Sequence, residues 1–299
     1  MTNATSAWLD LGEKQLPLFG RTFSMGRTKD NNVVFSSEKV SRQHAIVHAQ
    51  GNGEFSLVDL GSSNGTHLNG RRVIQPVSLQ PGDVIQIGEQ SLVFHLEKDG
   101  SEDDEIYLTQ AQMTVRDVRE LTCWFLLLDI ENFIQLSGQL PNDELARTVG
   151  AWIAECQRVI ESHGGTVSKF LGDGLLVYWN AQLTKPQNVA NAVQQLQVMQ
   201  ARRRPAFRCG LHHGSAVFGA AAAAGELTTL GQDLNFLFRM ERVAAAQGYP
   251  CVLSRAAQAA LSAFGQSQSL GAFPLKGFEG EHELFGWQPA KHAVETCAA

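Results

Sequence analysis

A run of apolar residues leads into a carboxylate in Trp124-Phe125-Leu126-Leu127-Leu128-Asp129-Ile130. A continuous apolar run of this length is typical of a strand that is buried on both faces of a sheet. An amphipathic helix follows, with apolar residues three and four positions apart between Leu145 and Ile160. Next come a hairpin with its turn at Gly172-Asp173-Gly174, a second helix, a strand pair within 207–220, and a helix that begins near Asp233. This succession predicts a mixed α+β layer fold.

The first third of the chain has another pattern, in which short β-rich runs alternate with turn residues such as Gly61-Ser62-Ser63-Asn64-Gly65. No helical period of useful length occurs there, which predicts an all-β sandwich. The chain has 299 residues and a net charge of −6, and most of that charge falls within Ser101–Glu120. We therefore expect a sandwich domain at 1–98, an acidic linker that continues into a short helix at 99–120, an α+β domain at 121–290 and a tail at 291–299.

Composition excludes several classes of protein. The mild acidity argues against a nucleic-acid binder that relies on a basic surface. The five cysteines have no CxxC spacing, so neither a zinc site nor a disulfide framework is expected. No apolar stretch reaches about 18 residues and Met1–Lys14 has no apolar signal-peptide core, so we expect a cytoplasmic protein without a membrane partner.

Three groups of loop residues in the sandwich carry hydrogen-bond donors suited to a phosphate. They are Gly26-Arg27, Ser41-Arg42-Gln43-His44 and Gly61-Ser62-Ser63-Asn64-Gly65. In the order of the motifs and the identity of their residues, they resemble the forkhead-associated (FHA) domain, a phosphothreonine-binding module, over about residues 8–96. The resemblance implies that Arg27, Ser41 and Arg42 bind the phosphate, and that Ser63 and Asn64 hold the peptide backbone beside it.

Other residues of the sandwich have structural interpretations. By the same resemblance His44 supports its loop from within, and Asn69-Gly70 is a turn rather than a contact. The alternative is a sandwich that serves only dimerisation or packing. The expected partner is a phosphothreonine-containing protein, or the chain's own linker phosphorylated at Thr114.

The α+β part contains two carboxylates at expected strand ends, Asp129 and Asp173. A charge directly after a buried strand is costly unless something compensates it, and paired carboxylates suit Mg²⁺ or Mn²⁺. The surrounding motifs, in order, are Lys169, Arg208 in 207–214, Thr228 and Asn235 in 228–235, Arg239, and Lys276 in 275–278. This series resembles the catalytic domain of class III nucleotide cyclases from about Trp124 to Trp287, which have a ferredoxin-like α+β fold.

The resemblance implies a function and roles for these residues. Family members convert a nucleoside triphosphate to a 3′,5′-cyclic nucleotide and pyrophosphate with two metal ions, here Mg²⁺ or Mn²⁺. Asp129, Asp173 and the Ile130 carbonyl would hold the metals. The remaining implied roles are pyrophosphate neutralisation by Arg208 and Lys276, ribose orientation by Asn235, α-phosphate stabilisation by Arg239, and further substrate binding by Phe133.

Base choice depends on Lys169 and Thr228, which resemble the adenine-reading positions and favour ATP as the substrate. In the family the site lies between two catalytic domains. The resemblance implies that one protomer supplies Asp129, Asp173 and Arg208. The other protomer would supply Lys169, Thr228, Asn235, Arg239 and Lys276. Since this chain has both sets and one catalytic domain, a head-to-tail homodimer is expected. The function expected is an adenylate cyclase regulated through phosphopeptide binding. The alternatives are a guanylate cyclase and a catalytically weak phosphoprotein-binding scaffold.

The sequence departs from the family pattern at two places. Asn132-Phe133-Ile134 replaces a Gly-Phe-Thr pattern, which removes a hydroxyl and a flexible backbone position. Phe236, Leu237 and Phe238 stand between Asn235 and Arg239, where the family prefers small residues. Both departures bear on rate rather than on the class of chemistry.

Overall fold

The computed structural model describes residues 6–12, 14–18, 20–51, 53–97, 119–202, 205–218 and 232–289. Most of the acidic stretch, with the predicted linker helix and Thr114, lies outside the described residues. Arg119 and Glu120, which were expected to end the linker, are instead the first residues of strand β12 (Arg119–Ile130).

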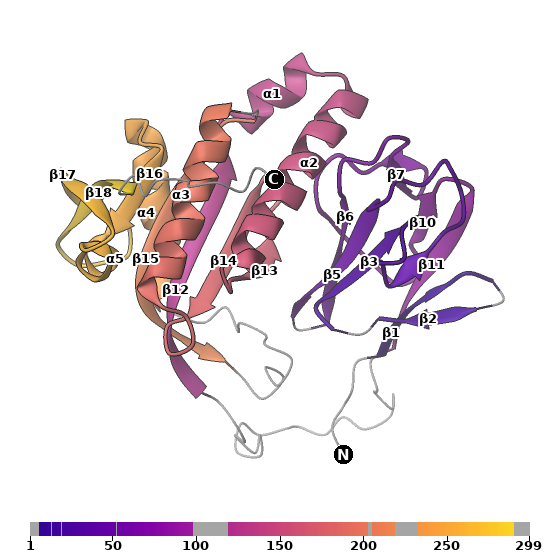
Figure 1. The fold of residues 1–299 in the computed structure, drawn as a ribbon, viewed down its shortest axis with the longest axis horizontal. Coiled ribbons are helices and arrows are strands. Elements are labelled where there is room, and N and C mark those ends of the chain that lie inside the picture. The colour runs from indigo at the N-terminus through magenta and orange to yellow at the C-terminus, as the bar shows by residue number, and fades with distance from the viewer. Residues whose placement is uncertain are drawn as a thin grey trace, which may run out of the picture.

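The N-terminal domain is a sandwich of paired sheets, as the alternation of short strands and turns predicts (Figure 1). One sheet has the order β2 (Gln15–Pro17), β1 (Ser6–Asp10), β11 (Gln90–Glu97), β10 (Val84–Ile87), β7 (Thr66–Leu68) and β8 (Arg71–Arg72). The other has the order β4 (Val33–Val34), β3 (Thr22–Gly26), β5 (Ala45–Gly51), β6 (Glu54–Asp59) and β9 (Val77–Ser78). Their inner faces bury a common core that includes Leu57, Ile85 and Phe94.

The predicted turn at Asn69 and Gly70 joins β7 to β8. Both residues have positive φ angles, 50° and 79°. A two-residue loop of this kind matches the twist of the strands that it connects, and Asn followed by Gly tolerates the left-handed backbone best.

The C-terminal domain is a sheet covered by helices on both faces (Figure 1). Its strand order is β13 (Thr166–Phe170), β14 (Gly174–Asn180), β12, β15 (Phe207–Phe218), β16 (Cys251–Ser254), β18 (Glu281–Pro289) and β17 (Gly265–Pro274). The helices are α1 (Phe133–Gln139), α2 (Asn142–Ser162), α3 (Pro186–Arg202), α4 (Gln232–Gln247) and α5 (Arg255–Leu261). The strand pair expected within 207–220 is a single strand, since β15 pairs with β12 from Phe207 to Phe218.

The apolar run of β12 divides its side chains between two cores, because successive residues of a strand point to opposite faces. Trp124, Leu126 and Leu128 pack with α2, α3 and α5. Phe125 and Leu127 pack with α4 on the other face. Burial on both faces is what the continuous apolar run predicts.

Helix α2 has the amphipathic pattern expected from its sequence, and it ends where Gly164 adopts a φ of 76°. Asn142 is the first residue of the helix, and Pro141 occupies the cap position. One face is buried against the sheet, through residues such as Leu145, Trp152, Cys156 and Ile160.

The opposite face of α2 packs on the sandwich, and Figure 1 shows the helix between the two domains. The closest approach joins Gly150 of α2 to the loop that follows β6. A Cβ atom on Gly150 would lie 2.2 Å from the Gly61 nitrogen and 2.4 Å from the Asp59 carbonyl oxygen. Glycine at 150 therefore allows backbone to touch backbone across the domain boundary.

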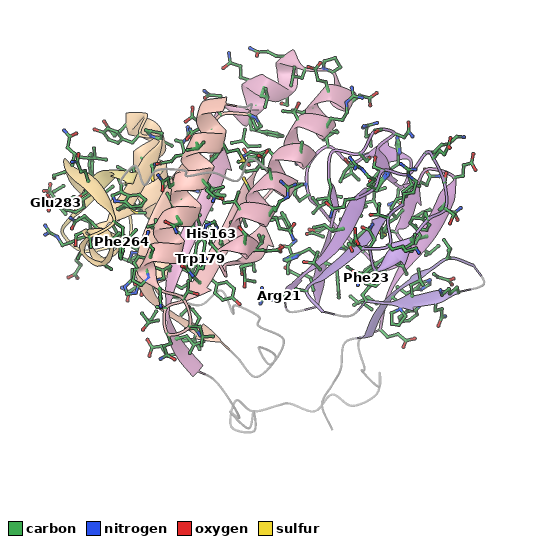
Figure 2. The ribbon with its side chains drawn as sticks, viewed as in Figure 1. Arg21, Phe23, His163, Trp179, Phe264 and Glu283 are labelled. Carbon is green, nitrogen blue, oxygen red and sulfur yellow. The ribbon has the colours of Figure 1, made fainter. Side chains whose placement is uncertain are left out.

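Contacts beside α2 extend this interface to the sheet. Ile46 and Val58 of the sandwich belong to the same buried cluster as the α2 face of the C-terminal domain. The guanidinium of Arg21 lies 5.7 Å from the ring centre of Tyr178 on β14, and Figure 2 shows Arg21 at the junction of the domains. The interface thus combines apolar burial with a cation–π contact.

His48 of β5 joins the sandwich to β13. Its Nε2 lies 3.3 Å from the Ser168 carbonyl oxygen, its Nδ1 lies 3.1 Å from Thr22 Oγ1, and its ring meets Phe170 edge-on at 4.8 Å. Burial lowers the pKa of His48 to about 4; the Ser168 hydrogen bond opposes this shift and the charge of Arg21 adds to it.

We predict that Gly150→Ala destabilises the protein, although alanine favours a helix by about 1 kcal/mol. The added methyl group meets backbone atoms at 2.2 and 2.4 Å, and such overpacking costs about 1–3 kcal/mol. The matched control is Gly138→Ala in α1, where no atom lies within 4 Å of the new methyl group. Urea unfolding should show a loss for the first variant and a small gain for the second; equal gains would contradict the close contact.

We also predict that the contribution of His48 to stability falls as the pH is lowered from about 6.5 to about 4. Over that range the unfolded chain protonates His48 and the folded chain does not, so folding loses up to about 3 kcal/mol. Burial also lowers the pKa of His44, which acts in the same direction. Urea unfolding of the wild type and His48→Gln at several pH values isolates this contribution: the stability of the variant relative to the wild type should rise as the pH falls, and a constant difference would show that His48 is not the group responsible.

Candidate functional site

The loops at one end of the sandwich fix two of the predicted phosphate-binding arginines side by side. The Arg27 amide donates to the Ser41 carbonyl at 2.9 Å. The Arg42 carbonyl accepts from the Thr28 amide at 3.3 Å, the Thr28 hydroxyl at 3.0 Å and Asn31 Nδ2 at 2.8 Å. With their backbones held this way, both arginines expose their side chains.

Further bonds join these loops to the serine-rich loop after β6. The Ser63 amide donates to Ser41 Oγ at 3.0 Å, and Asn64 Nδ2 donates to the Lys39 carbonyl at 2.7 Å. Gly26 is required here, because a Cβ atom would lie 2.3 Å from the Arg42 carbonyl oxygen. Arg27, Ser41, Arg42 and Ser63 consequently line one cleft, whereas the Asn64 amide is used to hold the Lys39 segment.

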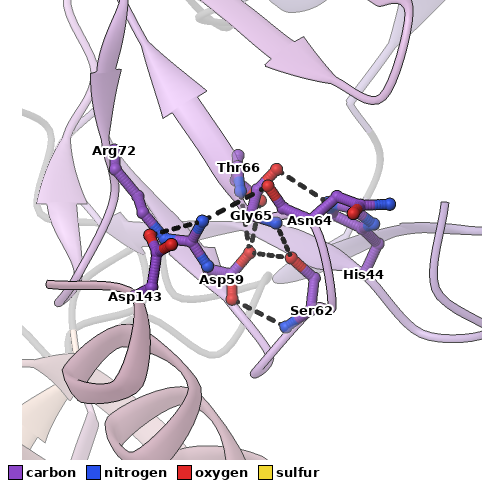
Figure 3. Close-up of polar contacts among 8 residues, drawn as sticks. All are labelled: His44, Asp59, Ser62, Asn64, Gly65, Thr66, Arg72 and Asp143. Carbon is purple, nitrogen blue, oxygen red and sulfur yellow. Dashed lines mark hydrogen bonds and ion pairs between the residues drawn. The ribbon is translucent and has the colours of Figure 1, made fainter. Parts of the chain in front are cut away.

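Asp59 organises the serine-rich loop (Figure 3). Its Oδ1 accepts from the amides of Gly61 and Ser62 at 3.0 and 2.9 Å. Its Oδ2 accepts from Ser62 Oγ at 2.6 Å and from the Thr66 amide and hydroxyl at 3.0 and 2.7 Å. Only 4% of Asp59 is exposed, so one buried carboxylate satisfies the donors that shape the loop.

His44 is fully buried beneath the same loops. Its Nδ1 accepts from the Ser41 amide at 3.0 Å, so the ring carries its proton on Nε2, which lies 3.3 Å from the Gly65 carbonyl oxygen. Burial lowers the pKa of His44 and keeps the ring neutral. Its position agrees with the supporting role that the sequence predicts.

Arg72 connects the serine-rich loop to α2 (Figure 3). Its Nη1 lies 2.9 Å from Asp143 Oδ1 in the first turn of the helix and donates to the Asn64 carbonyl at 3.3 Å. The guanidinium fills the space beside Gly65, where a Cβ atom would lie 2.4 Å from it. The loop that carries Ser63 and Asn64 is therefore anchored to the C-terminal domain.

In the C-terminal domain, Asp129 and Asp173 lie close together at one end of the sheet. Asp129 is opposite Gly174 in the pairing of β12 with β14, and the Ile130 amide donates to the Asp173 carbonyl at 3.2 Å. The pKa of Asp129 is raised to about 6, first by burial, then by the charges of Asp173 and Glu241, with Arg208 opposing the shift.

Arg208 of β15 bridges two carboxylates. It is opposite Asp129 in the strand pairing, with Nη2 3.3 Å from Asp129 Oδ2 and Nε 3.6 Å from Glu241 Oε1. Burial raises the pKa of Glu241, and the arginine opposes this. The guanidinium, expected to meet a pyrophosphate, compensates acidic groups in this structure.

A divalent cation fits the residues at this end of the sheet. The charge of Asp173 helps to raise the pKa of Asp129, and a bound cation would oppose that shift. Among the described residues no three or more histidine, cysteine or carboxylate side chains are arranged to hold a metal. The protein would thus offer two carboxylates and the Ile130 carbonyl, a sparse set that suits Mg²⁺, because Mg²⁺ retains waters and substrate phosphates as ligands.

Asn235 and Arg239 lie on the outer face of α4. The buried residues of this helix are Leu234, Leu237, Met240 and Ala244. At 100° per residue, Asn235 and Arg239 project from the opposite side. The structure therefore brings Asp129, Asp173 and Arg208 together within one chain, and directs Asn235 and Arg239 away from that sheet.

The other predicted residues are placed as follows. Lys169 is half-buried on β13, directly after the Ser168 carbonyl that His48 contacts. Lys276 is exposed between β17 and β18, and Phe133 begins α1. Thr228 lies outside the described residues.

The departures from the family pattern have structural explanations. Asn132 has a φ of 52°, a left-handed conformation that asparagine tolerates in place of glycine. The Phe236 ring lies edge-on to Phe278 at 5.3 Å and to His282 at 5.1 Å. Phe236 thereby packs α4 against the segment that carries Lys276.

Asp233 lies in the first turn of α4 and makes specific contacts there. Its Oδ2 accepts from the Ser215 amide at 2.6 Å, and its Oδ1 lies 3.4 Å from His212 Nε2. His212 Nδ1 in turn lies 2.8 Å from Ser254 Oγ. Ser254 Oγ accepts from the Ala257 amide as the cap of α5, so the buried His212 and Ser254 join β15 to α5.

The sandwich has a recognised family. Residues 23–88 match the family model of the FHA domain. The N-terminal domain is an FHA domain. Over 73 residues the chain is 44% identical to the glycogen accumulation regulator GarA of Mycolicibacterium smegmatis, a match that covers 24% of this chain and 45% of that protein.

The C-terminal domain has a cyclase-like α+β fold, which confirms the predicted two-domain architecture. The crystal structure of the adenylyl cyclase CyaB from P. aeruginosa superposes with a TM-score of 0.50 at 18% identity, covering 59% of this chain and 98% of that one. Adenylate cyclase 1 of Rhizobium meliloti is 25% identical over 196 residues, which are 60% of this chain and 29% of that protein. The chain spans less than half the length of the curated relatives named here. Within the described residues, the helices are too short or too polar to cross a membrane.

Sequence reasoning missed Asp59, Arg72 and Glu241. Asp59 had a local signal, because a carboxylate that ends a buried strand just before a serine- and glycine-rich loop suits a cluster of amide and hydroxyl donors. Glu241 lies seven residues after the buried Leu234, so helical spacing places it toward the sheet. Arg72 has no such signal, since its partner Asp143 belongs to the other domain.

We predict that Asp59→Ala destabilises the FHA domain by about 3 kcal/mol, because its buried donors lose a charged acceptor. The control is Asp83→Ala, whose carboxylate accepts from the Gln80 amide and Asn69 Nδ2 in an exposed turn and should cost about 1 kcal/mol. Thermal unfolding of both variants tests this, and equal losses would show that Asp59 does not organise the loop.

Proposed function

We propose that the chain is an adenylate cyclase, which converts ATP to 3′,5′-cyclic AMP and pyrophosphate, and that its FHA domain binds phosphothreonine peptides and regulates turnover. The observation that carries the catalytic part is the pairing of Asp129 with Asp173 beside Arg208 at one end of a cyclase-like sheet. The name of the R. meliloti relative supports the same reaction.

In this proposal the carboxylates of Asp129 and Asp173, with the Ile130 carbonyl, hold two Mg²⁺ or Mn²⁺ ions. When bound, the metals lower the pKa of the ribose 3′-hydroxyl and draw negative charge from the triphosphate. The ribose 3′-hydroxyl gives up its proton to solvent and its oxygen attacks the α-phosphorus. The bond from the α-phosphorus to the oxygen that bridges to the β-phosphate breaks, and pyrophosphate leaves with that electron pair.

The chain's own side chains position and neutralise the substrate. Arg208 exchanges its carboxylate partners for pyrophosphate oxygens, assisted by Lys276. Asn235 orients the ribose, and Arg239, one turn further along α4, meets charge that develops at the α-phosphate. Lys169 donates to a ring nitrogen of adenine, the Thr228 hydroxyl accepts from its exocyclic amine, and Phe133 completes the substrate-binding set.

The outward direction of Asn235 and Arg239 supports a homodimer in which each site uses both protomers. One protomer contributes Asp129, Asp173 and Arg208, and its partner contributes the α4 residues. A head-to-tail pair then contains two equivalent sites.

The primary test is cyclic nucleotide formation by the purified chain with ATP or GTP, each with Mg²⁺ or Mn²⁺. Cyclic AMP is expected, and Asp173→Ala should lower its formation by at least about 100-fold, because metal binding contributes several kcal/mol. The control Asp83→Ala should retain activity. Cyclic GMP as the main product would identify a guanylate cyclase, and no product under any condition, with or without phosphopeptide, would indicate a binding scaffold.

The shared site has a separate test. Asp173→Ala and Arg239→Ala should each be inactive, because each removes a different half of the site. In an equimolar mixture half of the dimers combine both variants, and one of their two sites is intact. About a quarter of the wild-type rate should return; no recovery in a mixture that exchanges subunits would contradict the dimer.

A further inference from the structure

The proposed phosphopeptide site is not bounded by the FHA domain alone. The cleft that Arg27, Ser41, Arg42 and Ser63 line has a volume of about 750 Å³ and a second wall formed by α2 of the cyclase-like domain. That wall consists of Ala151, Ala154, Glu155 and Arg158. A peptide on the FHA loops would therefore lie against the catalytic domain.

The α2 wall is held at a fixed position relative to the loops. Arg72 binds Asp143 at the start of the helix, and Gly150 contacts Gly61 two turns further along. Ala151, Ala154 and Arg158 follow on the same side of the helix, at spacings of three and four. The short side chains of the alanines leave room for a ligand, and Arg158 extends from the far end of the wall.

The charges of the cleft favour a ligand with more than one anionic group. The guanidinium groups of Arg27, Arg42 and Arg158 are exposed, and none has a carboxylate partner among the described residues. Lys39 is already paired with Glu89 at 2.6 Å. The other charged residues of the lining are Asp30, Glu38 and Glu155, so the cleft carries charges of both signs and is not a uniform basic patch.

Two of these arginines belong to the FHA loops and suit the phosphate dianion. Arg158 stands on the opposite wall, and a planar guanidinium binds a carboxylate through paired hydrogen bonds. We infer that the phosphopeptide site is composite: α2 forms its second wall, and Arg158 selects phosphothreonine peptides that carry an aspartate or glutamate on the side of the phosphothreonine that faces this helix. The inference rests on the proposed phosphopeptide binding by the FHA domain.

The test measures binding of fluorescent phosphothreonine peptides to the full chain. The peptides share a neutral sequence and differ only in the position of a single aspartate. At one or more positions the aspartate should tighten binding to the wild type by about three- to tenfold, and Arg158→Ala should abolish that gain. The neutral phosphopeptide should bind wild type and Arg158→Ala equally.

The matched control is Arg147→Ala, which removes another exposed arginine of α2, one that does not line the cleft. It should retain the aspartate preference. Arg27→Ala should weaken every phosphopeptide, with or without the aspartate, since it removes a phosphate contact. Charge reversal supplies a gain of function: Arg158→Glu should prefer a peptide with lysine where the wild type prefers aspartate.

The outcomes distinguish a failure of the composite site from a failure of phosphopeptide binding itself. If no phosphopeptide binds the wild type, phosphopeptide binding itself is wrong. If phosphopeptides bind and depend on Arg27, but Arg158→Ala keeps the aspartate preference and Arg158→Glu gains none for lysine, the FHA loops act alone and the composite site is overturned.

Discussion

The architecture depends on a contact between two glycines from different domains. Gly61 begins the serine-rich loop of the FHA domain, and Gly150 lies at the middle of α2; a Cβ atom on Gly150 would reach to 2.2 Å from the Gly61 nitrogen. Because neither glycine has a side chain, the backbone of the loop contacts the backbone of the helix. The Arg72–Asp143 ion pair and the His48 contact with Ser168 then form on either side of it.

This contact joins the two candidate sites through short paths. On the FHA side, the loop that meets α2 is shaped by Asp59 and carries Ser63 of the proposed phosphopeptide cleft. On the side of the cyclase-like domain, His48 contacts the carbonyl of Ser168 and the ring of Phe170, the two neighbours of Lys169 on β13. Helix α2 and strand β13 pack against the same core. A ligand that shifts the serine-rich loop can therefore displace Lys169, the residue proposed to recognise the base, through these packed elements.

The sequence predicted both folds and the placement of Asp129 and Asp173, because these depend on local patterns: an apolar run that ends in a carboxylate, and a Gly-Asp-Gly turn. The motif residues of the FHA loops are brought together in the same way, apart from Asn64, whose amide binds Lys39. The domain interface could not be predicted. From the sequence alone, Gly61 indicates an ordinary turn and Gly150 indicates a residue that destabilises its helix. Their contact becomes evident only when the two domains are placed together. Glu241 was missed for the related reason that its partner Arg208 is distant in the chain.

The central claim is that the FHA domain and the cyclase-like domain act as one coupled unit through α2, and thermodynamic linkage tests it most directly. The dissociation constant of one phosphothreonine peptide would be measured on the full chain with and without a non-hydrolysable ATP analogue and Mg²⁺. Coupling of about 1–3 kcal/mol changes this constant by about fivefold or more, and the change should be lost in Gly150→Ala. Identical constants in the wild type, with both ligands shown to bind, would contradict the account.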